Sequence, residues 1–104
     1  MKYRSIRTYS ELCKRWFASK AECRRGEALA LMEKEGIISN LIYQHKFSLS
    51  VKPRISITVD FAYIIDGKTV YEDTKGVLTR DFRTKMAWVK EKYDIDIQLN
   101  LGGK

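Results

Sequence analysis

Residues 55–75 have the sequence ISITVDFAYIIDGKTVYEDTK, and this stretch decides the fold. Apolar side chains recur at every second position through its first half, which is the pattern of a half-buried β-strand. Asp66-Gly67 is a strong signal for a two-residue hairpin turn, so the run that follows should pair antiparallel with this strand. The stretch therefore predicts a β-hairpin that carries Asp60 on one strand and both Asp73 and Lys75 on the other.

A helix and another strand are predicted before this hairpin. Ser19 and Glu22 have capping-box spacing, good helix formers continue to Glu35, and Gly36 supplies a stop. A period-two run follows and ends at Pro53. The alternation predicts that odd-numbered side chains share one face along each of the first two strands, namely Tyr43, His45, Phe47, Leu49 and Val51 on the first, and Ile55, Ile57, Val59, Phe61 and Tyr63 on the second.

A second helix and a last strand are predicted after the hairpin. Thr79 can cap a helix whose apolar residues Phe82, Met86, Val89 and Tyr93 recur at helical spacing. Residues 95–101 alternate again, and a strand-helix-strand unit favours a parallel pair. We therefore expect one α/β (α+β) domain over residues 1–104, with the order helix, three strands, helix, strand and a mixed sheet flanked by helices. Residues 1–17 form a basic N-terminal arm, and residues 18–101 form the core.

Composition narrows the class of protein. Of 104 residues, 44% are hydrophobic and 32% are charged, which is typical of a globular domain. No apolar run approaches the roughly 20 residues of a membrane-spanning helix, and no secretory signal is visible, so we expect a cytoplasmic protein without a membrane partner. Cys13 and Cys23, with a single His, cannot supply four ligands for structural zinc. We interpret both as reduced thiols.

The net charge of +7 points towards a polyanionic partner. Residues 1–25 carry eight basic residues against two acidic ones, so most of the excess lies at one end of the chain. Charge alone is equally compatible with a merely solvated basic surface. The aromatic residues interleaved with this charge in residues 1–17 show no clean periodicity, and we expect an arm with a short helical turn.

Acidic residues and a lysine can converge on the predicted hairpin. Asp73 and Lys75 leave the same face of their strand, and hairpin pairing can bring Asp60 beside them. Glu22 lies on a helical stripe with Gly26, which permits close approach of the helix to the sheet. Carboxylates that hold a divalent cation, together with a lysine near the phosphate, can hydrolyse a phosphodiester.

Each of these residues also has a purely structural explanation. Asp60 can be a solvent-exposed residue of a strand, Asp73 and Lys75 can form an ordinary ion pair, and Glu22 can belong to the cap of a helix. Gln44 fits either a support for a metal-bound water or an exposed amide. Two further interpretations are that Glu72 points to the face opposite Asp73 and has no part in the chemistry, and that His45 lies at the edge of the core.

At these residues the chain resembles the PD-(D/E)XK nuclease superfamily, and within it a group of small phage-encoded proteins known as a domain of unknown function, related to Holliday junction resolvase-like endonucleases. The superfamily core has the same restriction-endonuclease-like order of elements. The matching stretches are Lys2-Tyr3, Phe17 to Glu22, Glu33 to Ile38, Gln44 with Phe47, Asp60 to Tyr63, Glu72 to Gly76, and Thr79 through Phe82, Arg83 and Lys85. Val59 replaces the superfamily proline before Asp60, and Trp16 stands where relatives often have a small residue.

The resemblance implies a metal-dependent DNA endonuclease. Asp60, Asp73 and Glu22 would be metal ligands for Mg2+ or Mn2+, Lys75 would be the catalytic lysine, and Gln44 would support them. Branched DNA of the kind formed in recombination is the substrate it suggests, and such an enzyme would be a two-fold homodimer in the host cytoplasm. The rivals are a non-catalytic nucleic-acid binder and a phage protein-interaction module. The residues expected to contact DNA are Lys2, Arg4, Arg7, Lys14, Arg15, Lys20, Thr79, Arg83 and Lys85.

Overall fold

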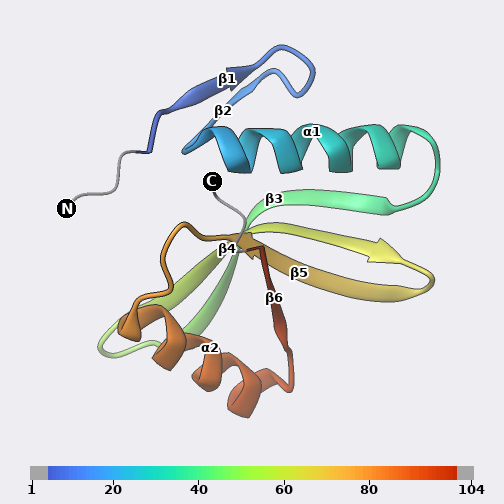
Figure 1. Cartoon of the computed structure of the whole chain (residues 1–104). Coiled ribbons are helices and arrows are strands. Elements are labelled where there is room, and N and C mark those ends of the chain that lie inside the picture. The colour runs from blue at the N-terminus through green and yellow to red at the C-terminus, as the bar shows by residue number, and fades with distance from the viewer. Residues whose placement is uncertain (1–4, 101–104) are drawn as a thin grey trace.

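A four-stranded sheet lies between two helices in the computed structural model, which describes residues 5–100 (Figure 1). Its strand order is β3-β4-β5-β6, with antiparallel pairing except between β5 and β6, which are parallel. The chain is therefore a single α+β domain with the predicted mixed sheet. The elements are β1 (Thr8–Ser10), β2 (Arg15–Phe17), α1 (Lys20–Lys34), β3 (Ser39–Ser50), β4 (Ile55–Ile65), β5 (Lys68–Thr74), α2 (Arg80–Tyr93) and β6 (Ile97–Asn100).

The caps and the turn that the sequence predicts are confirmed. Ser19 Oγ accepts a hydrogen bond from the Glu22 backbone N–H at 3.1 Å, and Thr79 Oγ1 accepts one from the Phe82 N–H at 3.2 Å. Asp66 and Gly67 have φ angles of 51° and 75°, as a type I′ hairpin turn requires. Neither helix of residues 5–100 is long and apolar enough to cross a membrane.

The N-terminal arm differs from the prediction, because it contains a β-hairpin rather than a helical turn. β1 and β2 pair antiparallel with Thr8 opposite Phe17. Ser10 Oγ donates to Glu27 Oε2 at 2.6 Å and accepts from the Cys13 N–H at 2.9 Å, which ties the hairpin to α1. Strands of three residues are too short to produce a recognisable alternation in the sequence.

The core consists of two apolar clusters, one for each helix, and Figure 1 shows the helices on opposite sides of the sheet. The cluster against α1 contains Phe17, Cys23, Leu29, Ile38, Phe61 and Tyr63. The cluster against α2 contains Phe47, Leu49, Ile57, Val59, Phe82, Val89 and Ile97.

The single-face prediction for the first two strands is wrong, because both strands change sides in the middle. Phe61 belongs to the α1 cluster, but Val59, two residues earlier, belongs to the α2 cluster. Tyr43 and Phe47 on β3 divide in the same way. Pairing runs from Tyr43 opposite Phe61 to His45 opposite Val59, and Gln44 between them has the left-handed φ of 56°. The left-handed conformation of Gln44 thus marks the place where the two strands turn over together.

Gly26 sets the distance between α1 and the sheet, as its place on the helical stripe predicts. A Cβ atom at this position would lie 2.7 Å from Phe17 Cζ and 3.3 Å from Phe61 Cε1. Both rings are buried, at 3% and 0% exposure, so neither can swing into solvent. Only glycine permits this approach, and the approach brings Glu22, one turn earlier, close to the sheet.

We predict that Gly26→Ala lowers the free energy of unfolding by about 1–3 kcal/mol, because overpacking two buried rings outweighs the helix propensity that alanine gains. Urea denaturation followed by circular dichroism measures this change. Gly76→Ala is the matched control, since nothing lies within 4 Å of its Cβ position and its stability should stay within about 0.5 kcal/mol of the wild type. Equal stabilities for the two variants would contradict the packing argument.

Candidate active site

Asp60 and Asp73 meet where the pairing of β4 with β5 stops. The regular ladder ends at Phe61 opposite Glu72. One residue further, the Asp60 backbone N–H donates to Asp73 Oδ1 at 2.8 Å, and the Thr74 N–H donates to Asp60 Oδ2 at 2.8 Å. Beyond the last backbone pair of β4 and β5, two carboxylates thus replace backbone carbonyls as hydrogen-bond acceptors. Because each is held by the main chain of the opposite strand, their relative position is fixed by the fold.

Glu22 and Gln44 reach the same region from α1 and β3. Glu22 is buried at 5% exposure, and its Oε2 accepts a hydrogen bond from Gln44 Nε2 at 3.2 Å. Besides burial, the charge of Asp73 raises the pKa of Glu22, and the charge of Glu22 in turn raises the pKa of Asp60. The capping-box explanation is therefore incomplete, because Ser19 caps the helix while the carboxylate of Glu22 turns towards the two aspartates.

Lys75 completes the group from the end of β5. Its Nζ lies 3.1 Å from Asp73 Oδ2 and 4.2 Å from the centre of the Phe82 ring on α2. Asp73 Oδ2 is buried and has no aligned hydrogen bond among the described residues, so the ammonium ion is its main compensation. An ion pair with one oxygen leaves capacity for a further cation at this atom.

The pKa values of the three acidic residues at the site are raised, because the carboxylates are buried close to one another. Burial raises the pKa of Asp60 to about 6, with a further increase from the charge of Glu22 and an opposing effect of the Thr74 N–H. Burial and the charge of Asp60 raise the pKa of Asp73 to about 6, against the effect of Lys75. Burial also raises the pKa of Glu22. The site is short of positive charge for its carboxylates at neutral pH.

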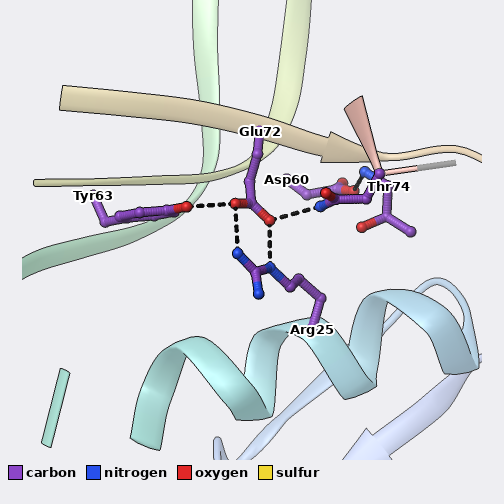
Figure 2. Close-up of polar contacts among 6 residues, drawn as sticks. Arg25, Asp60, Tyr63, Glu72 and Thr74 are labelled. Carbon is purple, nitrogen blue, oxygen red and sulfur yellow. Dashed lines mark hydrogen bonds and ion pairs between the residues drawn. The ribbon is translucent and has the colours of Figure 1, made fainter. Parts of the chain in front are cut away.

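Glu72, next to Asp73, points to the opposite face as predicted and is fully satisfied there. Figure 2 shows it between Arg25 on α1 and Tyr63 on β4. Arg25 Nε donates at 2.7 Å, Tyr63 Oη at 2.6 Å and Asn100 Nδ2 at 2.7 Å. Burial raises the pKa of Glu72, but these three hydrogen bonds outweigh it and leave the pKa below its usual value. Glu72 is thus a structural carboxylate.

The sequence did not predict that Arg15 would lie near the acidic site. Its guanidinium lies 4.1 Å from the centre of the Tyr43 ring, its charge acts on the Glu22 carboxylate, and its Nε is buried without a hydrogen-bond partner among residues 5–100. The hairpin puts it there, and no motif in the sequence indicates that hairpin. The sequence contains only a weak indication of the contacts of Glu72. Arg25 follows Glu22 by three residues, so both side chains lie on the face of α1 that packs on the sheet.

The residues expected to contact DNA are dispersed around this site. Lys2 and Arg4 lie outside the described residues. Thr79 caps α2, and Lys85 lies 3.5 Å from Asp81 on the same helix. His45 is half-buried beside the rings of Phe47 and Tyr71, in agreement with a place at the core edge. The exposed basic residues of this set are Arg7, Lys14, Lys20 and Arg83.

The donor atoms suit a hard divalent cation. In the described part of the chain, no three His, Cys, Asp or Glu side chains are arranged as a set that could hold a metal ion. Mg2+ does not need such a set, because it commonly binds one or two carboxylates and completes its shell with water and substrate phosphate. Asp60 and Asp73 supply two adjacent carboxylates, and the buried Oδ2 of Asp73 has spare acceptor capacity.

We predict that the metal-free protein becomes less stable by about 1–2 kcal/mol as the pH rises from about 5 to about 7.5. The pKa values of Asp60 and Asp73 are near 6 when folded and near 3.8 in an unfolded chain, so their contribution is complete below 3.8 and is lost as the pH rises through 6. Glu72 has its lowered pKa below this window and does not oppose the trend. Urea titrations in EDTA at a series of pH values measure the free energy of unfolding and its change with pH.

Asp73→Asn should remove about half of this pH dependence, because burial still raises the pKa of Asp60, and should make the protein more stable than the wild type at neutral pH. Asp66→Asn, at an exposed turn position, should retain the wild-type slope. A wild-type slope in Asp73→Asn would show that the two aspartates do not share the buried charge.

Comparison with known proteins gives one result. The model of the family described as "Protein of unknown function (DUF1064)" matches residues 2–102, which is nearly the whole chain. No curated protein and no solved structure matches. The match spans every helix and strand and all of the acidic residues discussed above. The chain therefore belongs to the DUF1064 family of proteins of unknown function.

Proposed function

We propose that this protein is a divalent-metal-dependent endonuclease that hydrolyses phosphodiester bonds of DNA. The observation that carries the proposal is the reciprocal hydrogen bonding of Asp60 and Asp73 across the end of the β4–β5 ladder, with Lys75 on one of the two carboxylates. The two backbone amides need only neutral acceptors, so two mutually repelling carboxylates at this depth cost stability unless a cation joins them. The resemblance to PD-(D/E)XK nucleases at the same residues supports the proposal.

The side chains divide the chemistry among them. Asp60 and Asp73 would hold a Mg2+ or Mn2+ ion, which would supply an acidified water and neutralise charge on the phosphate. Glu22, held by the Gln44 amide, adds a third carboxylate beside them. Lys75 brings a positive charge to the scissile phosphate and can orient the attacking water. Its position against the Phe82 ring limits the directions in which its ammonium group can point.

The surrounding charge favours a nucleic-acid substrate. The chain has a net charge of +7, and exposed basic residues on the hairpin and on α2 can contact phosphates on either side of the acidic site. Branched DNA as substrate, a two-fold homodimer that cuts both strands, and a cytoplasmic location are the further parts of this proposal.

We expect purified wild-type protein to nick or cut DNA in the presence of Mg2+ or Mn2+ and to lose this activity in EDTA. Asp73→Asn and Lys75→Met should each lower the cleavage rate by about a hundredfold or more, because each removes charge stabilisation worth several kcal/mol in the transition state. A gel assay with supercoiled, linear, single-stranded and branched DNA measures this.

The matched control for the cleavage assay is Asp66→Asn, which removes a carboxylate from the exposed hairpin turn and should leave the rate unchanged. Asp73→Asn that cleaves as fast as the wild type would refute the assignment. Wild-type protein that binds DNA but never cleaves it would identify a non-catalytic binder. Absence of both binding and cleavage would favour a protein-interaction module.

Metal binding can be tested without any DNA. We predict that Mg2+ or Mn2+ at saturating concentration raises the Tm of the wild type by roughly 5 °C or more, because binding only to the folded state stabilises it. Asp60→Asn should show no such increase, although its metal-free form should be the more stable of the two. Asp66→Asn should respond like the wild type. An equal shift in Asp60→Asn and the wild type would place the cation elsewhere.

A further inference from the structure

The hairpin of β1 and β2 presents an aromatic pair on its outer face. Tyr9 and Trp16 are direct partners across the ribbon, and their ring centres lie 5.3 Å apart in an edge-to-face arrangement. They are 42% and 52% exposed. Neither belongs to the two core clusters, so the packing of the domain does not account for them.

The inner face of the same hairpin is firmly attached to the domain. Phe17 is 3% exposed within the α1 cluster, and Ser10 is 1% exposed and bonded to Glu27. The aromatic pair therefore stands on a fixed ribbon rather than on a loose arm. A rigid platform of this kind loses little conformational freedom when a planar group stacks on it.

Positive charge surrounds the aromatic pair. The Arg7 guanidinium lies 4.8 Å from the centre of the Trp16 ring. Lys14 in the hairpin turn and Lys20 and Arg24 on α1 are exposed, whereas Glu11 is the one exposed acidic residue between residues 5 and 25. Cations around exposed aromatic rings match a ligand that combines planar faces with phosphates.

The hairpin also connects this surface to the acidic site. Arg15 is adjacent to Trp16 on β2, and its guanidinium lies over Tyr43, where its charge acts on Glu22. Successive side chains of a strand face opposite ways, so Arg15 lies on the inner face of the ribbon with Phe17, and Trp16 lies on the outer face.

We propose that the outer face of the β1–β2 hairpin binds an unpaired nucleotide of the DNA substrate, with the base stacked on Trp16 and Tyr9 and a flanking phosphate held by Arg7. The inference rests on the proposed action on DNA. A base inside a duplex has both faces covered by its neighbours, so an aromatic side chain stacks there only at the cost of unstacking them, whereas an unpaired base offers its face freely. The preferred substrate is therefore DNA with single-stranded nucleotides beside the cleaved bond.

The test compares binding of a labelled duplex with binding of the same duplex carrying a short unpaired bubble, both in EDTA. Wild-type protein should bind the bubble more tightly. Trp16→Ala combined with Tyr9→Ala should lose affinity for the bubble by roughly tenfold or more and change little for the duplex. Leu12→Ala is the matched control, because Leu12 is 48% exposed in the same hairpin and carries no ring.

Tryptophan fluorescence supplies a second readout that does not depend on affinity. The chain has two tryptophans, so Trp16→Phe leaves Trp88 as the single indole while it keeps an aromatic ring at the hairpin. Single-stranded oligonucleotide should quench the emission of the wild type. Trp16→Phe should lose this quenching but retain most of the affinity for the bubble.

The inference is overturned if the double alanine variant keeps the wild-type ratio of bubble to duplex affinity, or if oligonucleotide leaves the emission of Trp16 unchanged. A hairpin that captures a protein partner instead would give both of these results. The outcome is separate from the nuclease assignment, since the binding assays contain no metal. Suppose that the double alanine variant loses the preference for the bubble and that Asp73→Asn still cleaves at the full rate. These two results would support the role of the hairpin surface and reject the catalytic role of Asp73.

Discussion

The structure depends on the end of the β4–β5 ladder, where side chains replace main chain as hydrogen-bond acceptors. The amides of Asp60 and Thr74 bond to carboxylates, so the strands can separate without leaving buried donors unsatisfied. The same separation turns β3 and β4 over and lets α1 and α2 each obtain an apolar cluster. The position of the acidic group is therefore tied to the pairing of the strands, because a change of rotamer at Asp60 or Asp73 would leave a backbone amide without its acceptor.

The pKa values of the two adjacent carboxylates on β5 are shifted in opposite directions. Glu72 is surrounded by three donors that hold its pKa low, whereas Asp73 shares its surroundings with Asp60 and has a raised pKa. Both are almost completely buried, so burial alone does not separate them. The difference lies in the partners, since Arg25 neutralises Glu72 through two hydrogen bonds while Lys75 pairs with one oxygen of Asp73. Unfavourable charge is thereby confined to the group formed by Asp60, Asp73 and Glu22.

Much of this arrangement could be predicted from the sequence, because it depends on local signals. Ser19, Thr79 and Asp66-Gly67 mark element boundaries through caps and a turn, and they act over a few residues. The reversal at Gln44 and the hairpin that carries Arg15 could not be predicted in this way. An apolar alternation looks the same whether or not the strand turns over, and the three-residue strands of the hairpin are too short to show an alternation at all.

The consecutive placement of Glu72 and Asp73 also constrains the alignment of β5 within the sheet. A slip of one residue would direct Asp73 towards Arg25 and turn the longer Glu72 side chain away from the residues that donate hydrogen bonds to it. Such a misaligned molecule would lose its interior ion pair and its acidic group in the same event. The correct alignment of β5 is therefore required both for the fold and for the acidic group. Misaligned molecules that keep part of the activity should not accumulate.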